Sequence, residues 1–178
     1  LPVRELCFGY RESVFKQRPE LVVLSAVLRL SRGDRAPGEK LVRHFALERV
    51  RTQDSGSPSA GCIFKNVRWD RPDVTPESLI HIFPEFGRFR AAPGIPAGFL
   101  IEQAGLKGRR VGGAMVSSRH ANFIVNTGAA TAVDVQALVG YAKDAVRERF
   151  GLSLEEEIQY VGFEDVPAEY AREAEFKL

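Results

Sequence analysis

The stretch "TAVDVQALVGYAKDAVRERFG", Thr131 to Gly151, is the clearest predictor of the fold. Thr131 can cap a helix N-terminus, and Asp134 stands three residues on, as in a capping box. Gly151 suits the end of a helix, and the arginines just before it suit the negative end of the helix dipole. The stretch therefore predicts an amphipathic helix with one apolar face, made of Val135, Leu138, Val139, Ala142 and Val146.

Shorter elements are expected on both sides of this helix. "TPESLIHIF" begins with Thr75 before Pro76, a typical helix start, and "PAGFLIEQAGLKG" predicts a helix stopped by Gly105. "VGGAMV", "NFIVN" and, after the long helix, "LEEEIQYVG" predict strands. This mixture indicates an α+β or α/β protein, and no internal repeat is visible.

The first part of the chain predicts one strand and one helix. "LVVLSAVLRL" (Leu21 to Leu30) is short, apolar and β-branched, as in a buried strand. "SRGDRAPG" then predicts a loop, and residues 39–50 a short helix. The loop "TQDSGSPSAG" is the candidate domain boundary. Because the chain starts with Leu1 on the approach to a strand, we expect an N-terminal part of a larger protein to be missing.

Composition excludes several classes of protein. With 25 basic and 23 acidic residues among 178, net charge gives no argument for nucleic acid or a membrane surface as partner. The longest apolar stretch is too short to span a bilayer. Cys7 and Cys62 are too few for a disulfide scaffold and lack the spacing of a zinc site, so no metal is expected. A reducing cytoplasm suits such a chain.

Common catalytic motifs are absent: there is no G-x-G-x-x-G, Walker A, H-E-x-x-H or G-x-S-x-G sequence. Cys62, in "PSAGCIFKN", is one of several polar side chains in apolar or glycine-rich surroundings. A buried cysteine is usually a small hydrophobic residue, whereas one on a glycine-rich turn beside a lysine can be reactive. The other such residues are Tyr10, Arg11, Lys65, Asn66, His120, Asn122 and Glu157.

Five motifs together carry a family resemblance. "FGYRESVFK", "PSAGCIFKN", "AGFLIEQAGLKG", "VGGAMVSSRHANFIVN" and "FGLSLEEEIQYVG", in this order, resemble the C-terminal two-thirds of the UDP-N-acetylenolpyruvoylglucosamine reductase (MurB) family. The resemblance implies reduction of UDP-N-acetylglucosamine enolpyruvate to UDP-N-acetylmuramate with FAD and NADPH. That reaction belongs to peptidoglycan precursor synthesis, and so to cell wall formation, cell shape and cell division.

The resemblance also implies an architecture. The fold would be α+β, with residues 1–50 as the back half of a FAD-binding (PCMH-like) domain. Residues 51–155 would form an α/β substrate-binding domain, and residues 156–178 would return to the FAD domain as a strand and tail. The full-length form is expected to be a monomer.

Three catalytic roles follow from the resemblance. Cys62 matches the family's proton donor, usually Ser and sometimes Cys, and an unperturbed thiol (pKa ~8.5) is mostly protonated at neutral pH. Arg11 matches the arginine against the substrate carboxylate, which a guanidinium can bind in a bidentate way. Glu157 matches the glutamate taken as an acid that helps polarise the enolate. The alternative for Cys62 is a buried structural thiol.

Binding roles follow in the same way. Asn66 matches the asparagine that contacts the nucleotide part of the substrate, and Lys65 is expected to point away from Cys62, toward a substrate phosphate or solvent. Tyr10 would line the flavin–substrate junction or pack the domain seam. His120 and Asn122 are candidate substrate contacts, with an ordinary core or surface role as the alternative for His120. Arg51 and Gln53 are candidate cofactor contacts, and Cys7 is expected to pack.

The sequence departs from the family pattern at two positions. Asp54 and Val67 stand where proline is usual or common, which changes loop stiffness without removing a catalytic group. The segment after Leu21–Leu30 has no candidate for a substrate-closing tyrosine. Two other interpretations remain beside the reductase: a UDP-sugar-binding module without redox activity, and another member of the wider FAD-oxidase fold, which "AGCIFKN" and "LEEEI" disfavour.

Overall fold

The computed structural model of the protein describes residues 1–18, 20–53 and 56–162. The chain divides into two compact units, Leu1–Glu48 and Arg49–Leu178. Asp54 and the tail 163–178, for which sequence analysis raised expectations, lie outside the described residues.

The first unit contains short helices and exposed connecting segments. Its elements are η1 (Val3–Glu5), α1 (Val14–Gln17) and most of α2 (Arg35–Thr52). None of the described residues from 1 to 53 is buried. The unit therefore has no apolar core of its own among the described residues.

The strand predicted at residues 21–30 is wrong. These residues form neither helix nor strand, and side chains such as Leu24 and Val27 are 92% and 100% exposed. An apolar strand needs neighbouring strands and a covering layer. The described residues of the first unit contain only one isolated bridge, Gly9 to Glu12, so no sheet is there for the segment to join.

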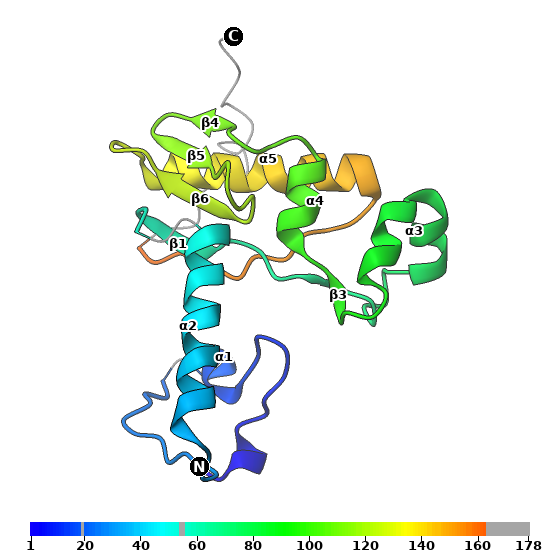
Figure 1. Ribbon diagram of the computed structural model, residues 1–178. Helices are drawn as coiled ribbons and strands as arrows, with labels where there is room; N and C mark the ends of the chain where they lie inside the picture. The colour runs from blue at the N-terminus through cyan, green and yellow to red at the C-terminus, as the bar shows by residue number, and fades with distance from the viewer. Residues whose placement is uncertain (19, 54–55, 163–178) are drawn as a thin grey trace. The chain divides into compact units, whose positions relative to one another are not determined.

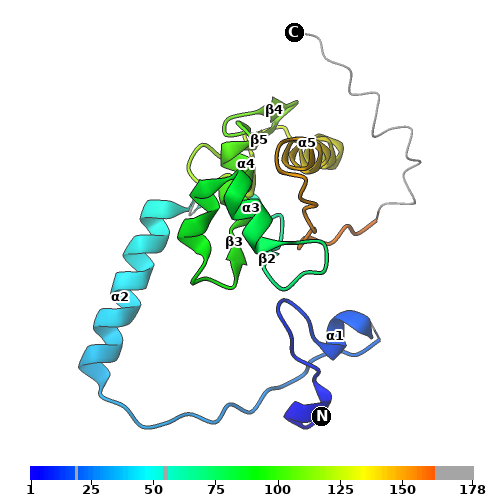
Figure 2. The ribbon, with the colours of Figure 1, turned by 90° about the vertical axis from the view of Figure 1, so that its right-hand side faces the viewer.

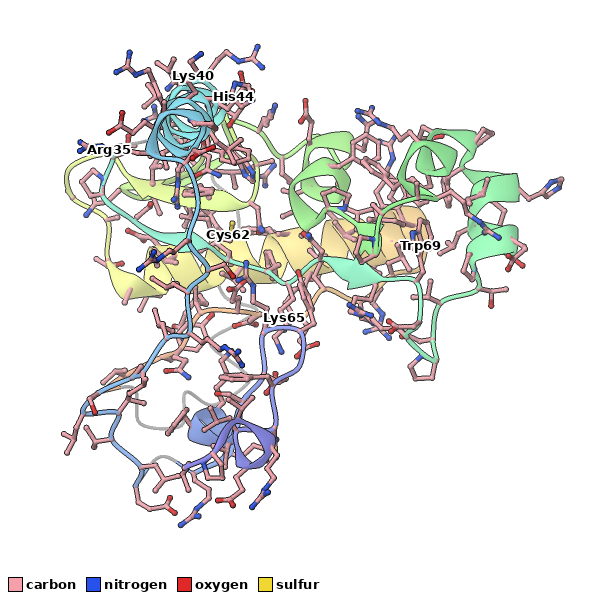
Figure 3. The ribbon with its side chains drawn as sticks, turned by 60° about the horizontal axis from the view of Figure 1, so that its bottom comes forward. Arg35, Lys40, His44, Cys62, Lys65 and Trp69 are labelled. Atoms are coloured by element: carbon pink, nitrogen blue, oxygen red, sulfur yellow. The ribbon has the colours of Figure 1, made fainter. Side chains whose placement is uncertain are left out.

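The helix predicted at residues 39–50 is confirmed and is longer than expected. α2 begins at Arg35, inside the predicted loop "SRGDRAPG" (Figure 1). Pro37 lies in the first turn, where its missing N–H costs no helical hydrogen bond. An ion pair between Arg35 and Glu39, at 2.7 Å and four residues apart, supports the same turn. Figure 3 labels Arg35, Lys40 and His44 along this helix.

The second unit is built on a four-stranded antiparallel sheet in the order β1-β6-β5-β4. The strands are β1 (Ser59–Cys62), β4 (Arg110–Val111), β5 (Ala114–Val116) and β6 (Phe123–Asn126). Helix α5 (Ala132–Phe150) contacts β4 and β5, and Figure 2 shows it end-on beside the sheet. The strand predicted in "NFIVN" is confirmed. "VGGAMV" is not one strand, because Gly112 and Gly113 form a turn that separates the end of β4 from β5.

Helix α5 matches its prediction closely. Asp134 N–H donates to Thr131 Oγ1 at 3.2 Å, and Thr131 N–H donates to Asp134 Oδ2 at 2.9 Å, which completes the capping box. Gly151 ends the helix in the left-handed region, with φ of 69°. The apolar face points into the core, where Leu138, Val139, Ala142, Val146 and Phe150 are buried.

A second, two-stranded sheet follows β1 in the chain. Strands β2 (Val67–Arg68) and β3 (Gly94–Ile95) pair antiparallel, α3 (Pro76–Ile82) and η2 (Pro84–Phe89) lie between them in the chain, and α4 (Ala97–Gln103) follows β3. Of these helices, η2 contacts β3. The helices predicted in "TPESLIHIF" and "PAGFLIEQAGLKG" are confirmed, and Gly105 follows α4 with φ of 80°. Val67, where the resembling family often has proline, is fully buried opposite Ile95.

The strand predicted in "LEEEIQYVG" is wrong as a full strand. Only one isolated bridge forms, between Phe64 and Glu156. Beyond Lys65 the partner segment enters β2 and pairs with β3 instead, so the ladder is not continued there.

Candidate functional site

Gly61 sets the local backbone of residues 61–66, which we call the cysteine segment. The β1–β6 register shifts between Ser59 and Cys62, and Gly61 lies in this irregularity with φ of 83°. A glycine with positive φ is a common way to build a β-bulge, and bulges change where the next side chain points. Cys62 therefore follows a bulge, at the end of β1, and is half-buried.

The segment after Cys62 lies opposite the segment that carries Glu157. Glu157 N–H donates to the carbonyl of Ile63, and Lys65 N–H donates to the carbonyl of Glu155, both at 2.8 Å. The bridge between Phe64 and Glu156 lies between these two bonds. The register puts Ile63, the neighbour of Cys62, directly across from Glu157.

The three glutamates alternate between two faces, as expected for an extended segment. Glu155 forms an ion pair with Lys65, whereas Glu156 accepts from Lys143 of α5 at 2.9 Å. Burial and then the hydrogen bond to Glu156 raise the pKa of Tyr160 well above its usual range. Glu157, by the same alternation, shares the face of Glu155 and is half-buried.

Lys65 does not extend into solvent, which was one of the two directions expected for it. Its side chain is only 13% exposed and is held against Glu155. The negative charge of Glu155 gives the ammonium group a partner on the adjacent segment. Cys62 and Lys65 are three residues apart on one segment, and Figure 3 labels both residues.

Asn122 is buried and bonded to the cysteine segment. Its Oδ1 accepts from Phe64 N–H at 2.9 Å, and its Nδ2 donates to the Phe64 carbonyl at 2.8 Å. Its own carbonyl accepts from Ile63 N–H at 2.9 Å. Only 3% of Asn122 is exposed, so the predicted substrate contact lies in the interior beside β1.

His120 lies in the same turn, between β5 and β6. Ser117 Oγ accepts from His120 N–H at 2.9 Å, and His120 Nδ1 accepts from Asn122 N–H at 3.3 Å. The ring packs edge-on against Phe123, with centroids 4.9 Å apart. It also lies close to α4, since a Cβ on Gly98 would come within 3.1 Å of His120 Cε1.

Asn66 links the cysteine segment to the start of α4. Its Oδ1 accepts from Ala97 N–H at 3.1 Å, which satisfies one of the free N–H groups in the first turn of that helix. Beyond this segment, Trp69 Nε1 donates to the Phe89 carbonyl at 3.1 Å. Figure 3 labels both Lys65 and Trp69. The cysteine segment is thus held along its length by β6, residues 155–157 and α4.

The two candidate cofactor residues lie at the end of α2. Gln53 Oε1 accepts from Arg49 at 3.1 Å, and Arg51 is exposed. Arg119, next to His120, donates to the carbonyls of Val50 and Gln53 at 3.1 and 3.3 Å. The end of α2 is therefore tied to the turn that carries His120 and Asn122.

Tyr10 and Arg11 lie in the first unit. Arg11 has a positive φ of 59° and stacks near the Tyr10 ring, 5.8 Å from its centroid. They belong to another unit than Cys62, so their roles toward the substrate stay predictions. Cys7, expected to pack, is exposed with φ of 49°, since the described residues of this unit form no core.

Sequence reasoning missed the contacts of three residues that shape the site: Glu155, Ser117 and Arg119. The contact of Glu155 could have been expected in part, because Glu155 shares a face with Glu157 and so faces a side chain of the segment that pairs with residues 155–157. Ser117 and Arg119 stand in "SSRHAN". Ser117 accepts from a backbone N–H two residues away, and Arg119 donates to a carbonyl far away in sequence. No motif predicts either bond. Among the described residues, no helix is both long and apolar enough to cross a bilayer.

Comparison with known proteins gives a consistent picture. Residues 52–161 match the family described as "UDP-N-acetylenolpyruvoylglucosamine reductase, C-terminal domain". A protein of that reductase name from Fervidobacterium nodosum is 36% identical over 155 residues, covering 87% of this chain and 42% of the relative. "UDP-N-acetylenolpyruvoylglucosamine reductase 2" of Symbiobacterium thermophilum is 40% identical over 158 residues, covering 89% and 43%.

A solved structure with the same name is also similar. The reductase (MurB) from Thermus caldophilus shares 38% identity, covers 74% of this chain and 38% of its own, and has a TM-score of 0.43. The chain spans less than half the length of the curated relatives above, a smaller share than the expected two-thirds.

Proposed function

Because the chain belongs to the UDP-N-acetylenolpyruvoylglucosamine reductase C-terminal domain family, we propose that it is the substrate side of such a reductase. The substrate would be UDP-N-acetylglucosamine enolpyruvate and the product UDP-N-acetylmuramate, a cytoplasmic precursor of peptidoglycan. The observation that carries this proposal is the pairing of the Cys62 segment with residues 155–157, through bonds of 2.8 Å on either side of the Phe64–Glu156 bridge. This pairing supports the proposal by holding the backbone next to Cys62 beside the segment that carries Glu157.

Cys62 would supply the proton that completes the reduction. Addition of hydride to one carbon of the enolpyruvyl double bond leaves an enolate, whose other carbon must take a proton. The thiol S–H bond breaks, the new C–H bond forms, and the thiolate is later reprotonated from solvent. A half-buried thiol after a bulge has the limited solvent access that favours a directed proton transfer.

Glu157 would donate a hydrogen bond to the enolate, and Arg11 would bind the substrate carboxylate. Removing one such stabilising donor typically costs ~2.7–4 kcal/mol of barrier. Lys65, Asn66, His120 and Tyr10 would bind the remainder of the substrate. Lys65 would serve as a positive charge near an anionic group, with Glu155 fixing its position.

The redox cofactors are also part of the proposal. FAD, reduced by NADPH, supplies the hydride when it is bound. Arg51 fits the cofactor chemically, since it is an exposed cation at the end of α2 that can bind an anionic group. Gln53 fits less well, because Arg49 already donates to its side-chain oxygen and Arg119 to its carbonyl. We therefore assign the cofactor contact to Arg51 first.

A second candidate function is a UDP-sugar-binding module without redox activity. The observation that favours it is the separation of the chain into two units, of which the second has its own buried core. Such a unit could hold the nucleotide sugar through Asn66 and Lys65 without taking part in electron transfer.

One experiment separates the two candidates. The protein is incubated with FAD, desalted and examined by visible absorption, then supplied with NADPH and the enolpyruvyl substrate. Retained flavin bands and formation of UDP-N-acetylmuramate support the reductase. A colourless protein that binds the nucleotide sugar in calorimetry supports the binding module, and a protein that does neither contradicts both.

A further inference from the structure

We propose that Asn122 is a positioning residue, whose side-chain amide takes the place of a strand beside Phe64 and so fixes Cys62 relative to Glu157. The inference rests on the proposed function for its kinetic consequences. It gives Asn122 a role other than substrate contact, and it follows from the hydrogen bonds of one short segment.

The peptide groups of the cysteine segment divide between two sides. The carbonyl of Ile63 and the N–H of Lys65 bond to residues 155–157. The N–H and carbonyl of Phe64 point the other way, as alternation along an extended chain requires. Strand β1 ends at Cys62, so the ladder to β6 does not continue as far as Phe64.

Asn122 satisfies both groups of Phe64 at once. Its Oδ1 accepts at 2.9 Å and its Nδ2 donates at 2.8 Å, which copies the pair of bonds that a neighbouring strand would make. Phe64 is 2% exposed, so solvent water does not reach its peptide groups to replace these bonds. A buried peptide group left without a partner is costly, which makes this arrangement the preferred one.

Asn122 is itself held in place by its surroundings. Asn122 is 3% exposed, and its N–H donates to His120 Nδ1 at 3.3 Å. Ser117, 1% exposed, accepts from the backbone N–H groups of Arg119 and His120 and closes the turn. Phe64 is thus held between a fixed turn on one side and residues 155–157 on the other. A displacement of Phe64 would move Cys62 and Ile63, and with them the position opposite Glu157.

The variants that test this role are Asn122→Ala and Asn122→Asp, made in the protein after loading with FAD. The first removes both bonds to Phe64, and the second keeps an acceptor but removes the donor. Asn126→Ala is the matched control. Asn126 is an exposed asparagine at the other end of β6, and its side chain accepts from Gly128 and Ala130, away from the cysteine segment.

A positioning role predicts a specific kinetic pattern. Both Asn122 variants should slow oxidation of the reduced enzyme by substrate by about 100-fold, the loss that a displacement of about 1 Å can cause. Reduction by NADPH and the dissociation constant of the substrate should be unchanged, as should all three quantities in Asn126→Ala. In a Cys62→Ala background, Asn122→Ala should cause no further loss, because the group it positions is gone.

Hydrogen exchange gives a readout that is independent of activity. The amides of Phe64 and Lys65 should exchange faster in both Asn122 variants, while those of α5 remain protected. If Asn122→Ala does not fold, Asn122→Asp carries the same comparison.

Three results would overturn the proposal: a raised substrate dissociation constant with an unchanged rate, multiplicative losses in the double variant, or unchanged exchange at Phe64. A wild-type enzyme without reductase activity would instead contradict the proposed function, and the exchange result would still decide whether Asn122 holds Phe64.

Discussion

The backbone N–H of Glu157 donates to the carbonyl of Ile63 over 2.8 Å, and this bond joins two segments separated by more than ninety residues of chain. It places Glu157 opposite the immediate neighbour of Cys62. The backbone that carries the proposed acid and the backbone next to the proposed proton donor are therefore held together by peptide hydrogen bonds. A site built in this way keeps its geometry without a bound ligand.

Replacement of Glu157 by glutamine should lower turnover more than substrate binding. The amide keeps the size of the side chain but loses the acidic proton, so an interaction made mainly in the transition state is weakened. We expect kcat to fall by ~100-fold or more, the usual range for loss of general acid catalysis, with KM little changed. Steady-state kinetics with the FAD-loaded protein measures both.

Glu156→Gln is the matched control for this change. Glu156 is the next residue along the segment but bonds to Lys143 of α5, on the opposite face. Its replacement should leave kcat unchanged. A pure rise in KM in Glu157→Gln, or an equal loss in Glu156→Gln, would show that the assignment of Glu157 is wrong.

Asp134 should make stability depend on pH in the acidic range. Its hydrogen bond with the Thr131 backbone is the main cause that holds the pKa of the Asp134 carboxyl below the ordinary 3.8, so the ionised form favours the folded state. This contribution is complete above the unfolded-state pKa, and it is lost as pH falls through the lower folded-state pKa.

The check is urea unfolding of the wild-type protein and of Asp134→Asn from neutral pH down to about pH 3. The stability advantage of the wild-type protein should be constant at neutral pH and should shrink in the acidic range. An advantage that grows on acidification would contradict the proposed sign.

Gly113 should not tolerate alanine. A Cβ at this position would overlap the backbone of Ala129 and Ala130, which lead into α5, and backbone atoms cannot move aside as a flexible side chain can. We expect Gly113→Ala to lower the free energy of unfolding by roughly 1–3 kcal/mol, the usual cost of overpacking. Chemical denaturation measures this loss.

Gly140→Ala is the control, and it should change stability in the opposite direction. Gly140 lies inside α5 with no heavy atom within 4 Å of a built Cβ, so alanine would add helix propensity without a clash, a gain of about 0.5–1 kcal/mol. Equal effects of the two substitutions would contradict the packing described for Gly113.

The helices of the second unit could be predicted from sequence because their signals are local. The Thr131–Asp134 capping box and Gly151 fix both ends of α5 within a few residues of chain. The segment Leu21–Leu30 could not be read in the same way. An apolar run predicts burial only if other strands exist to cover it, and the described part of the first unit has none.

The residue types of the site could be predicted from sequence, but the hydrogen bonds and ion pairs that connect them could not. The resemblance singled out Cys62 and Glu157, and the structure pairs their segments. The bonds from Asn122 to Phe64 and from Arg119 to Val50 and Gln53 join residues far apart in sequence, which periodicity does not reveal. The ion pair between Lys65 and Glu155 depends on the strand register, which was also not fixed by sequence.

The proposed proton-donor role of Cys62 is tested most directly by rapid mixing of the reduced FAD-loaded protein with UDP-N-acetylglucosamine enolpyruvate. Cys62→Ser should still oxidise with substrate, because a hydroxyl can also donate a proton. Cys62→Ala should be reduced normally by NADPH but should oxidise at least ~100-fold more slowly with substrate. An unchanged rate of oxidation in Cys62→Ala would contradict the account, since the reaction would then take its proton from another group.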